Sequence, residues 1–452
     1  MKGRGIKGSG IKGLLDGARS LAGPRLTVVR NTASLLVMRL GVPMLSTALM
    51  FVLSRKLGPE GVGRYTLAYT FLYFASAVAP LGLQPVLTRE GARSRDRLDA
   101  LLASASVVGF GASLITALGV AAIAWHSGYD PETRLAILLA TLTVVPGTVA
   151  VLLEGSLAAI QRMDYTLICA LSEAVVRVGG GIVALLGGYG LAGVMIAAVL
   201  ARAVYAVQAA LLLRREGIRL RVGVERRIVE NLLKLAPTFV LIAVVAALYW
   251  RINIVMLSQS EHLENLGLYG AAWRLLELAM VLPQSLCLAV YPNMAALAKS
   301  DMHAVRKLGD STIRTLLLCT IPLAVAVTLT APWILRVLYG QQFVGAAATL
   351  SVLVWTIVPY SIVRYQAYAL IAVERQGGDL LMNGIMAAVT IAANLALIPR
   401  YGALGAAMAT LGSIVVYALL QYEYLRRWAP TVWTPIRLGR LLPRFAQETR
   451  HG

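Results

Sequence analysis

The residues of this chain that could do chemistry are arginines placed inside long apolar stretches. Burying an arginine near the centre of a bilayer costs about 2.5–3.5 kcal/mol, so each must face water, a partner or a ligand. A guanidinium group stays charged and offers a planar fork of donors that matches phosphate oxygens. Only three glutamates share these stretches, so the pattern indicates an anionic ligand. The residues are Arg39, Arg177, Arg202, Arg251, Arg274, Arg336 and Arg364, with Glu154, Glu173 and Glu277.

Arg39 and Arg251 are two arginines that have no acidic neighbour at helical spacing. Arg39 lies about 12 Å into its apolar stretch, counted at the rise of an α-helix, and is too deep to reach water easily. Arg251 lies in the outer part of its stretch, beside aromatic residues and Asn253. We therefore expect Arg39 and Arg251 to face a cavity, where a phosphate-bearing ligand would compensate their charge without a permanent ion pair.

Other arginines have a local partner that offers a structural explanation. Glu173 and Arg177 are four residues apart on one predicted helix, and Arg274 and Glu277 are three apart, so each pair could be mutually neutralised. Arg336 lies near an outer helix end, where a long side chain can extend to water. For these residues a structural role and a ligand-binding role remain open.

The other reactive residues form no catalytic or metal-binding pattern. The three cysteines lie singly inside apolar stretches, and the four histidines lie between stretches or at the C-terminus. The connections between stretches are short, so none can hold a catalytic domain, and no Gly-rich phosphate loop of the Walker type occurs. We expect a protein that is not an enzyme and holds neither a cofactor nor a metal.

The elements that must position the arginines are transmembrane helices. The chain is 58% hydrophobic and only 14% charged, and each apolar stretch has about the 20 residues that a membrane-spanning helix needs. Helices satisfy every backbone hydrogen bond within one span, so we expect an all-α fold of about twelve spans. Pro237, Pro283, Pro322 and Pro359 should bend or break their helices. The expected spans are 31–53, 62–87, 99–124, 135–157, 165–186, 190–213, 233–257, 266–290, 312–337, 344–372, 380–398 and 403–424.

Cations concentrate in every second gap between the spans. Cationic loops stay in the cytoplasm, so both termini should be cytoplasmic in a cell-membrane protein. The formal charge of +20 then reflects this bias and attraction to anionic lipids, which argues against a nucleic-acid partner. The expected divisions are a basic N-terminal arm at 1–30, an N lobe at 31–213, a basic linker at 214–232, a C lobe at 233–424 and a basic tail at 425–452.

The two halves of the chain contain an internal repeat. The segment Tyr189–Gly193 resembles Tyr401–Gly405, and Gly63–Tyr65 resembles Gly267–Tyr269. Six spans return the chain to the same side of the membrane, so the halves should be parallel repeats related by an axis along the membrane normal. Two such bundles would leave a cavity at their interface, as in transporters that work by alternating access.

Several motifs resemble those of a known family. The segment Arg55–Tyr65, followed by Thr88-Arg89-Glu90, is similar to the signature of Wzx-like polysaccharide-lipid flippases of the multidrug/oligosaccharidyl-lipid/polysaccharide (MOP) exporter superfamily, as is Leu266–Tyr269 in the second half. The resemblance covers residues 31–425. Many relatives carry an acidic residue late in the seventh span, where this chain has Arg251.

This resemblance implies two six-helix lobes in a V shape and transport of a polyprenyl-diphosphate-linked oligosaccharide from the inner to the outer leaflet. In the family, spans one, two, seven and eight line the cavity, which favours Arg39, Arg251 and Arg274 as ligands of the diphosphate. The secondary candidates are Arg202, Arg364, Asn253 and Glu277.

Alternative functions remain. An ion-coupled multidrug or small-molecule exporter of the same superfamily would share the architecture, but it should place acidic residues at the midplane to bind cations. A membrane glycosyltransferase or polymerase would need a large external loop or a set of acids and bases. The expected partners are the lipid-linked oligosaccharide, membrane lipids and glycan-assembly proteins, and we expect a monomer.

Overall fold

The computed structural model describes residues 10–218, 224–260, 262–298, 300–373 and 377–428, and these ranges contain helices and no strand. Within the helices, the side chains of residues 10–33, 35–36, 39–40, 235, 302 and 377–380 are outside the description. The expectation of an all-α fold is therefore confirmed for the described part of the chain.

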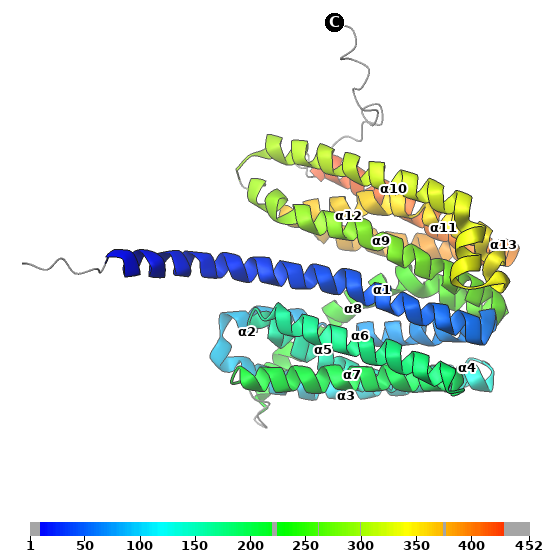
Figure 1. The fold of residues 1–452 in the computed structure, drawn as a ribbon, viewed down its shortest axis with the longest axis horizontal. Helices are drawn as coiled ribbons and strands as arrows, with labels where there is room; N and C mark the ends of the chain where they lie inside the picture. The colour runs from blue at the N-terminus through cyan, green and yellow to red at the C-terminus, as the bar shows by residue number, and fades with distance from the viewer. Residues whose placement is uncertain (1–9, 219–223, 261, 299, 374–376, 429–452) are drawn as a thin grey trace, which may run out of the picture.

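The helices form two lobes that lie one above the other in Figure 1. The N lobe contains α1 (Gly10–Val78), α2 (Leu83–Arg93), the short 3₁₀ helix η1 (Arg95–Arg97), α3 (Leu98–His126), α4 (Pro131–Thr141), α5 (Val144–Ala159), α6 (Met163–Leu186) and α7 (Gly190–Arg215). The C lobe contains α8 (Arg226–Ser260), α9 (Leu263–Leu297), α10 (Met302–Leu338), η2 (Gln341–Ala346), α11 (Ala347–Val354), α12 (Ile357–Ala372) and α13 (Gly377–Trp428). Helix α1 packs against both α6 and α9, so it joins the two lobes.

The described residues include ten helical segments long and apolar enough to cross a membrane. Two of these, residues 41–93 and 381–428, are far longer than the ~20 residues of one span. Each is broken at a glycine with positive φ, at Gly58 (φ 66°) and Gly402 (φ 54°), where the chain reverses direction. Counted as two crossings each, they bring the total to the twelve that the sequence predicts.

Three of the four prolines expected to bend or break their helices do not break them. Helices α8, α9 and α10 run continuously through Pro237, Pro283 and Pro322. The tenth span is interrupted before Pro359, between α11 and α12, so that this proline falls in the first turn of α12. A proline is tolerated in a first turn because its missing N–H would have no helical acceptor there.

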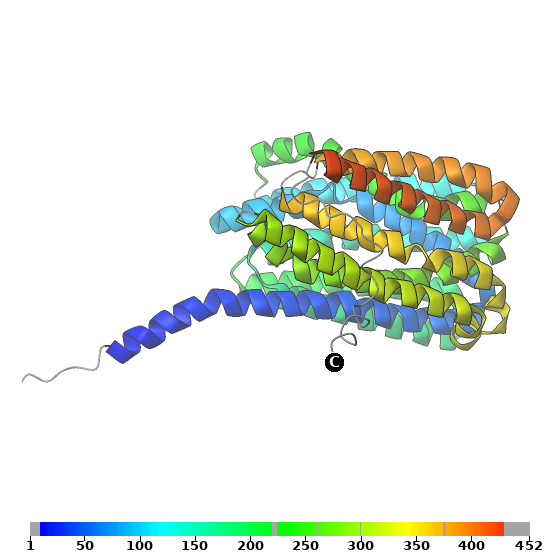
Figure 2. The ribbon, with the colours of Figure 1, turned by 90° about the horizontal axis from the view of Figure 1, so that it is seen from above.

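The first helix is longer than the expected span 31–53. It begins at Gly10 and continues to the break at Gly58, and its N-terminal part extends beyond the ends of the other helices (Figure 1, Figure 2). Much of the segment expected as a basic arm is thus helical, although its glycines lower helix propensity.

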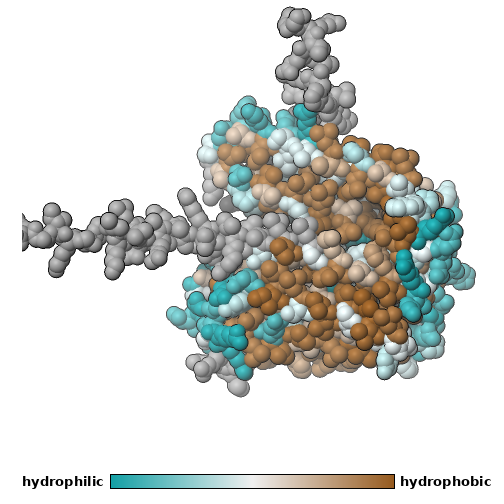
Figure 3. All heavy atoms as spheres, viewed as in Figure 1, coloured by the Kyte–Doolittle hydropathy of each residue, from teal (hydrophilic) through white to brown (hydrophobic). Residues whose placement is uncertain are grey.

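An apolar belt covers the middle of the face seen in Figure 3, and hydrophilic residues gather at its two ends. Large apolar side chains on the belt are exposed, such as Ile115 at 73% and Leu329 at 77%. Exposure on this scale would be unfavourable in water, so these side chains face lipid tails. The end that carries Arg89, Arg93 and Arg97 is called the basic end below, and the other the opposite end.

The internal repeat is visible in the packing of the lobes. Gly63 and Gly267, which the repeat relates, lie against each other at the opposite end. A Cβ on Gly63 would lie 2.1 Å from the Leu263 carbonyl oxygen, and one on Gly267 would lie 1.8 Å from the Pro59 carbonyl oxygen. The same offset relates Pro59 to Leu263, so the contact is reciprocal. Such reciprocity is the property of two elements related by a twofold axis.

Candidate functional site

A cavity of about 390 Å³ lies between the two lobes. Its walls come from both halves of α1, from α6 and α7 of the N lobe, and from α8 and α9 of the C lobe. The volume is within the range of small-molecule sites, which suits the charged head of a larger molecule. We call it the interlobe cavity.

The C-lobe wall carries an Arg–Glu–Arg group. Arg251 Nη2 of α8 donates to Glu277 Oε1 of α9 at 2.5 Å, and Arg274 Nη1 donates to Glu277 Oε2 at 3.0 Å. The indole Nε1 of Trp273 also donates to Glu277 Oε1 at 2.9 Å. Two arginines thus share one carboxylate, and this group, Arg251–Glu277–Arg274, is called the C-lobe triad. It carries a net charge of +1.

The N-lobe wall carries a similar group. Arg202 Nη1 of α7 lies 3.2 Å from Glu173 Oε2 of α6, and Arg177 Nε lies 3.9 Å from Glu173 Oε1. Arg177 Nη2 also donates to Ser46 Oγ of α1 at 2.7 Å. This group, Arg177–Glu173–Arg202, is called the N-lobe triad, and it too carries a net charge of +1.

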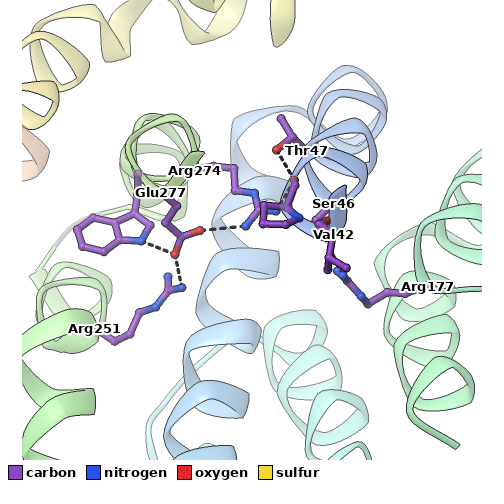
Figure 4. A network of polar contacts seen from close by, with 9 residues as sticks. Val42, Ser46, Thr47, Arg177, Arg251, Arg274 and Glu277 are labelled. Atoms are coloured by element: carbon purple, nitrogen blue, oxygen red, sulfur yellow. Dashed lines mark hydrogen bonds and ion pairs between the residues drawn. The ribbon is translucent and has the colours of Figure 1, made fainter. Parts of the chain in front are cut away.

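Helix α1 lies between the two triads, as Figure 4 shows with Arg177 on one side and the C-lobe triad on the other. It meets the N-lobe triad through Ser46 and the C-lobe triad through the Pro43 carbonyl oxygen, which accepts from Arg274 Nη2 at 3.3 Å. Among the described residues, four arginines and two glutamates line the interlobe cavity, and together they carry a formal charge of +2. Low-dielectric walls strengthen the field of this charge, which favours an anion inside.

A second cavity of about 220 Å³ adjoins the first. Arg202, Arg251, Tyr69, Leu72 and Thr143 line both, so the two guanidinium groups lie on the boundary between them. An anion held there would be accessible from both cavities. The adjoining cavity therefore extends the space between the lobes beyond these two guanidinium groups.

The lobes are in contact at the opposite end, beyond the cavity. Besides the glycine contact, Tyr129 Oη lies 3.1 Å from Ser258 Oγ, and Gln259 Nε2 donates to Tyr129 Oη at 2.6 Å. Arg55 Nη2 donates to the Val337 carbonyl oxygen at 2.7 Å. These contacts connect N-lobe to C-lobe residues, so they close the interlobe cavity toward this end.

A charged cluster stabilises the N-lobe side of that closure. Arg64 lies 3.4 Å from Asp130 and 2.9 Å from Glu132, and Asp130 caps α4 by accepting from the Thr133 backbone N–H. Burial opposes ionisation of Asp130, but hydrogen bonds from Thr133 and the nearby Arg64 guanidinium outweigh it and hold its pKa below the usual value. Asp130 thus stays charged at neutral pH and keeps its ion pair with Arg64.

The structure places the predicted site residues in three kinds of surroundings. Arg251, Arg274, Arg202 and Glu277 line the interlobe cavity. Arg39 lies in α1 one turn before Pro43, but its side chain is outside the described residues. The expectation that Arg251 lacks an ion-pair partner was wrong, because Glu277 reaches it from the neighbouring helix.

Asn253 and Arg364 do not line the described interlobe cavity. Asn253 is 1% exposed and donates to Tyr269 Oη and to Thr410 Oγ1 inside the C lobe. Residues two apart on a helix point in different directions, so Asn253 faces the core when Arg251 faces the cavity. Arg364 lies over the rings of Tyr360 and Tyr368, at 6.0 and 5.5 Å from their centroids.

Sequence reasoning missed the cavity-facing role of Arg177 and Glu173. Their spacing of four residues suggested a simple pair, yet Glu173 lies closer to Arg202 than to Arg177. A signal was present in the sequence. The predicted spans 165–186 and 190–213 each contain one arginine, Arg177 and Arg202, and the single acid in these two spans is Glu173. One carboxylate between two guanidinium groups leaves a cation free for a ligand.

Comparisons with known proteins identify families that the chain matches. A family model described as "Polysaccharide biosynthesis protein" matches residues 28–298, and one described as "Lipid II flippase MurJ" matches residues 166–438. The "Probable flippase AglR" of Haloferax volcanii is 28% identical over 170 residues, which make up 37% of this chain and 36% of AglR. The match thus spans little more than a third of that relative.

Solved structures share the fold. That of "Lipid II flippase MurJ, inward closed conformation" has a TM-score of 0.73 at 14% identity, and the similarity covers 88% of this chain and 87% of MurJ. An inward-facing multidrug resistance MATE family transporter of the MOP superfamily has a TM-score of 0.69 at 15% identity, over 86% of this chain and 97% of the transporter. At such identities the similarity shows the fold alone.

Proposed function

Because the chain belongs to the polysaccharide biosynthesis protein family, as a Wzx-like flippase of the MOP exporter superfamily, we propose that it moves a polyprenyl-diphosphate-linked oligosaccharide across the membrane. The proposed direction is from the cytoplasmic to the outer leaflet, and the proposed mechanism is alternating access of the interlobe cavity. The product would supply the assembly of a surface glycan.

The observation that carries this proposal is the charge of the interlobe cavity. Two Arg–Glu–Arg triads, one on each lobe, give it a net charge of +2. A diphosphate diester carries two negative charges at neutral pH, which would balance that charge. Buried unbalanced charge is costly, so the cavity favours an anion of this size and valence.

In the proposed complex, Arg251 and Arg274 contact the diphosphate from the C lobe, together with Arg39 from α1. Arg177 and Arg202 of the N-lobe triad lie on the facing wall of the same cavity. Each glutamate holds two guanidinium groups in place, so little side-chain freedom is lost when the ligand binds. The N–H groups of the arginines that are not used by the glutamates would donate charge-assisted hydrogen bonds to the phosphate oxygens.

The proposed transport cycle requires that the contacts between the lobes at the opposite end separate. In the described state these contacts are the Gly63–Gly267 packing and the hydrogen bonds of Tyr129 and Arg55. An anion bound to both triads would draw the lobes together around itself. If the ligand binds one of the two states, closed or open at the opposite end, more tightly than the other, its binding shifts the equilibrium toward that state.

Transport of a defined substrate into proteoliposomes tests the proposal. The purified protein should move a fluorescent oligosaccharide linked to a polyprenyl diphosphate, and the same glycan on a polyprenyl monophosphate should move roughly tenfold more slowly. A charge-assisted hydrogen bond contributes about 1.5–3 kcal/mol, so the loss of one phosphate should be measurable. Equal rates for the two lipids would contradict a diphosphate site.

The similarity to a MATE transporter raises a second candidate function, export of a small molecule. A positively charged drug would enter a cavity that is itself positively charged, and this repulsion disfavours its binding. Transport of a cationic dye but not of the lipid-linked glycan in the same proteoliposomes would favour this alternative.

We propose that both termini and the basic end face the cytoplasm of the cell, with the N lobe at 31–213, the linker at 214–232 and the C lobe at 233–424. The basic end of the described structure carries Arg89, Arg93 and Arg97, and the opposite end carries Asp130 and Glu132. Retention of cationic loops inside the cell supports this orientation.

Cysteine labelling in intact cells checks the orientation. In a background without native cysteines, a membrane-impermeant thiol reagent should label His126→Cys, because His126 is exposed at the opposite end. The same reagent should label Ser300→Cys, exposed at the basic end, only after the cells are permeabilised. The reverse labelling pattern would invert the proposed topology and, with it, the direction of transport.

A further inference from the structure

A third cavity, of about 540 Å³, lies at the basic end and shares no residue with the interlobe cavity. Its walls come from α2, from η1 and the start of α3, and from the first turns of α8. The charged residues of its lining are Arg89, Glu90, Arg97 and Lys234. None of these residues has a role in the proposed transport site.

The α8 wall of this cavity belongs to a segment that links the lobes. Residues 226–239, called the strap below, form the first part of α8. Ile228, Leu232 and Phe239 of the strap pack into the apolar core of the N lobe. Further along the same helix, Ile254 and Leu257 are buried in the core to which the C-lobe helices contribute. A ligand between the strap and the N lobe would therefore lie where the two lobes are joined.

The cavity has the chemistry of an amphiphile's binding site. Arg89, Arg97 and Lys234 against Glu90 give its lining a formal charge of +2. Arg89 and Arg97 are exposed, with ion pairs to Glu90 at 2.9 Å and to Glu225 at 3.6 Å, and such surface pairs exchange readily for another anion. Val86, Leu101, Ile228 and Leu232 supply an apolar wall beside these cations.

We propose that this cavity binds an anionic phospholipid from the leaflet at the basic end, with its phosphate between Arg89, Arg97 and Lys234. A free phosphate ion would satisfy the cations but leave the apolar wall uncovered, whereas the glycerol and first methylenes of a phospholipid cover it. Cations and apolar side chains lie side by side in the lining of this cavity, as the headgroup and the first methylenes of a phospholipid do at the surface of a bilayer. The bound lipid holds the strap on the N lobe.

Lipid retention tests this proposal with the full-length protein. The purified chain is transferred from nanodiscs of equal phosphatidylglycerol and phosphatidylcholine into detergent, and retained lipids are counted by native mass spectrometry. The wild type should retain phosphatidylglycerol over phosphatidylcholine. The variant Arg89→Gln/Arg97→Gln/Lys234→Gln should lose this preference by about tenfold, since each basic group near a membrane surface contributes to anionic-lipid binding.

Matched variants separate the site from general charge and from folding. Arg214→Gln/Arg215→Gln/Arg227→Gln removes three cations that lie outside the cavity, with exposed side chains and at the same end of the molecule, and it should retain the preference. Glu90→Gln removes the acid that competes for Arg89 and should raise the preference about twofold, an increase that misfolding would not produce. Arg251→Ala should retain the lipid, so failure of the cargo site and failure of this site can be distinguished.

Three results would overturn the proposal. Equal loss of phosphatidylglycerol in the control triple variant would show that lipid retention depends on the net charge of the protein and not on this cavity. Retention of phosphatidylcholine as strongly as phosphatidylglycerol by the wild type would exclude an anionic headgroup. Displacement of the bound lipid by excess inorganic phosphate would identify the ligand as a free anion, because a phospholipid also held by the apolar wall should remain.

Discussion

Replacing Arg251 with alanine is expected to reduce glycan-lipid transport per folded molecule by roughly 10- to 100-fold. Arg251 is one of two cations on the C-lobe triad, and its guanidinium lies on the boundary between the interlobe cavity and the adjoining one. A hydrogen bond to a charged group contributes about 1.5–3 kcal/mol, which corresponds to this loss. Arg251→Lys should recover part of the rate, because lysine keeps the charge but not the planar fork. The measurement is initial transport in proteoliposomes, normalised to folded protein.

The shared carboxylate provides the control for this prediction. Removing Arg251 leaves Glu277 with Arg274 as its remaining ion-pair partner among the described residues, so some loss of stability is also expected. In Arg251→Ala/Glu277→Gln the carboxylate is removed as well, and Arg274 alone keeps the net charge of +1 that the triad has in the wild type. If the arginine binds the diphosphate, transport by the double variant stays low. If its role is only to neutralise Glu277, transport recovers, because the carboxylate that needed it is gone.

Replacing Gly267 with alanine is expected to shift the protein by at least roughly tenfold toward the state in which the lobes part at the opposite end. The new Cβ would lie 1.8 Å from the Pro59 carbonyl oxygen and 3.0 Å from the Gly63 nitrogen, both backbone atoms that cannot rotate away. Overpacking of this kind typically costs about 1–3 kcal/mol, and separation of the two helices would relieve it. The same substitution at Gly63 should have the same effect, because the contact is reciprocal.

Spin-label distances between His126→Cys and His262→Cys, in a background without native cysteines, report this shift. Both residues are exposed at the opposite end, one in each lobe. The distances should lengthen in Gly267→Ala and in Gly63→Ala. Gly111→Ala is the matched control, since a Cβ there meets no atom within 4 Å and should leave the distances unchanged. Wild-type distances in both interface variants would show that the glycine contact does not hold the lobes closed.

Pairing between helices could not be predicted from the sequence. Arg251 and Glu277 are 26 residues apart and meet only because α8 and α9 present them to one cavity. Glu173 could reach Arg177 on its own helix, yet the closer contact is with Arg202 of α7. Residue spacing along one helix allows a pair, but the rotation and crossing of neighbouring helices decide whether it forms. Helical periodicity separates Asn253 from Arg251 on the surface of α8, but the packing of α8 decided that Asn253 faces the core and Arg251 the cavity.

The sequence by itself determined the membrane-spanning helices, the repeat and the excess of intramembrane arginine, because hydrophobic length, turn glycines and charge are local properties of the chain. Gly190 and Gly402, matched in the repeat, both adopt positive φ where the chain turns between antiparallel helices. Only the tertiary structure decided that four arginines and two glutamates meet in one cavity with a charge of +2. That charge depends on which side chains share a desolvated space, and helices distant in the sequence create such a space only when they pack.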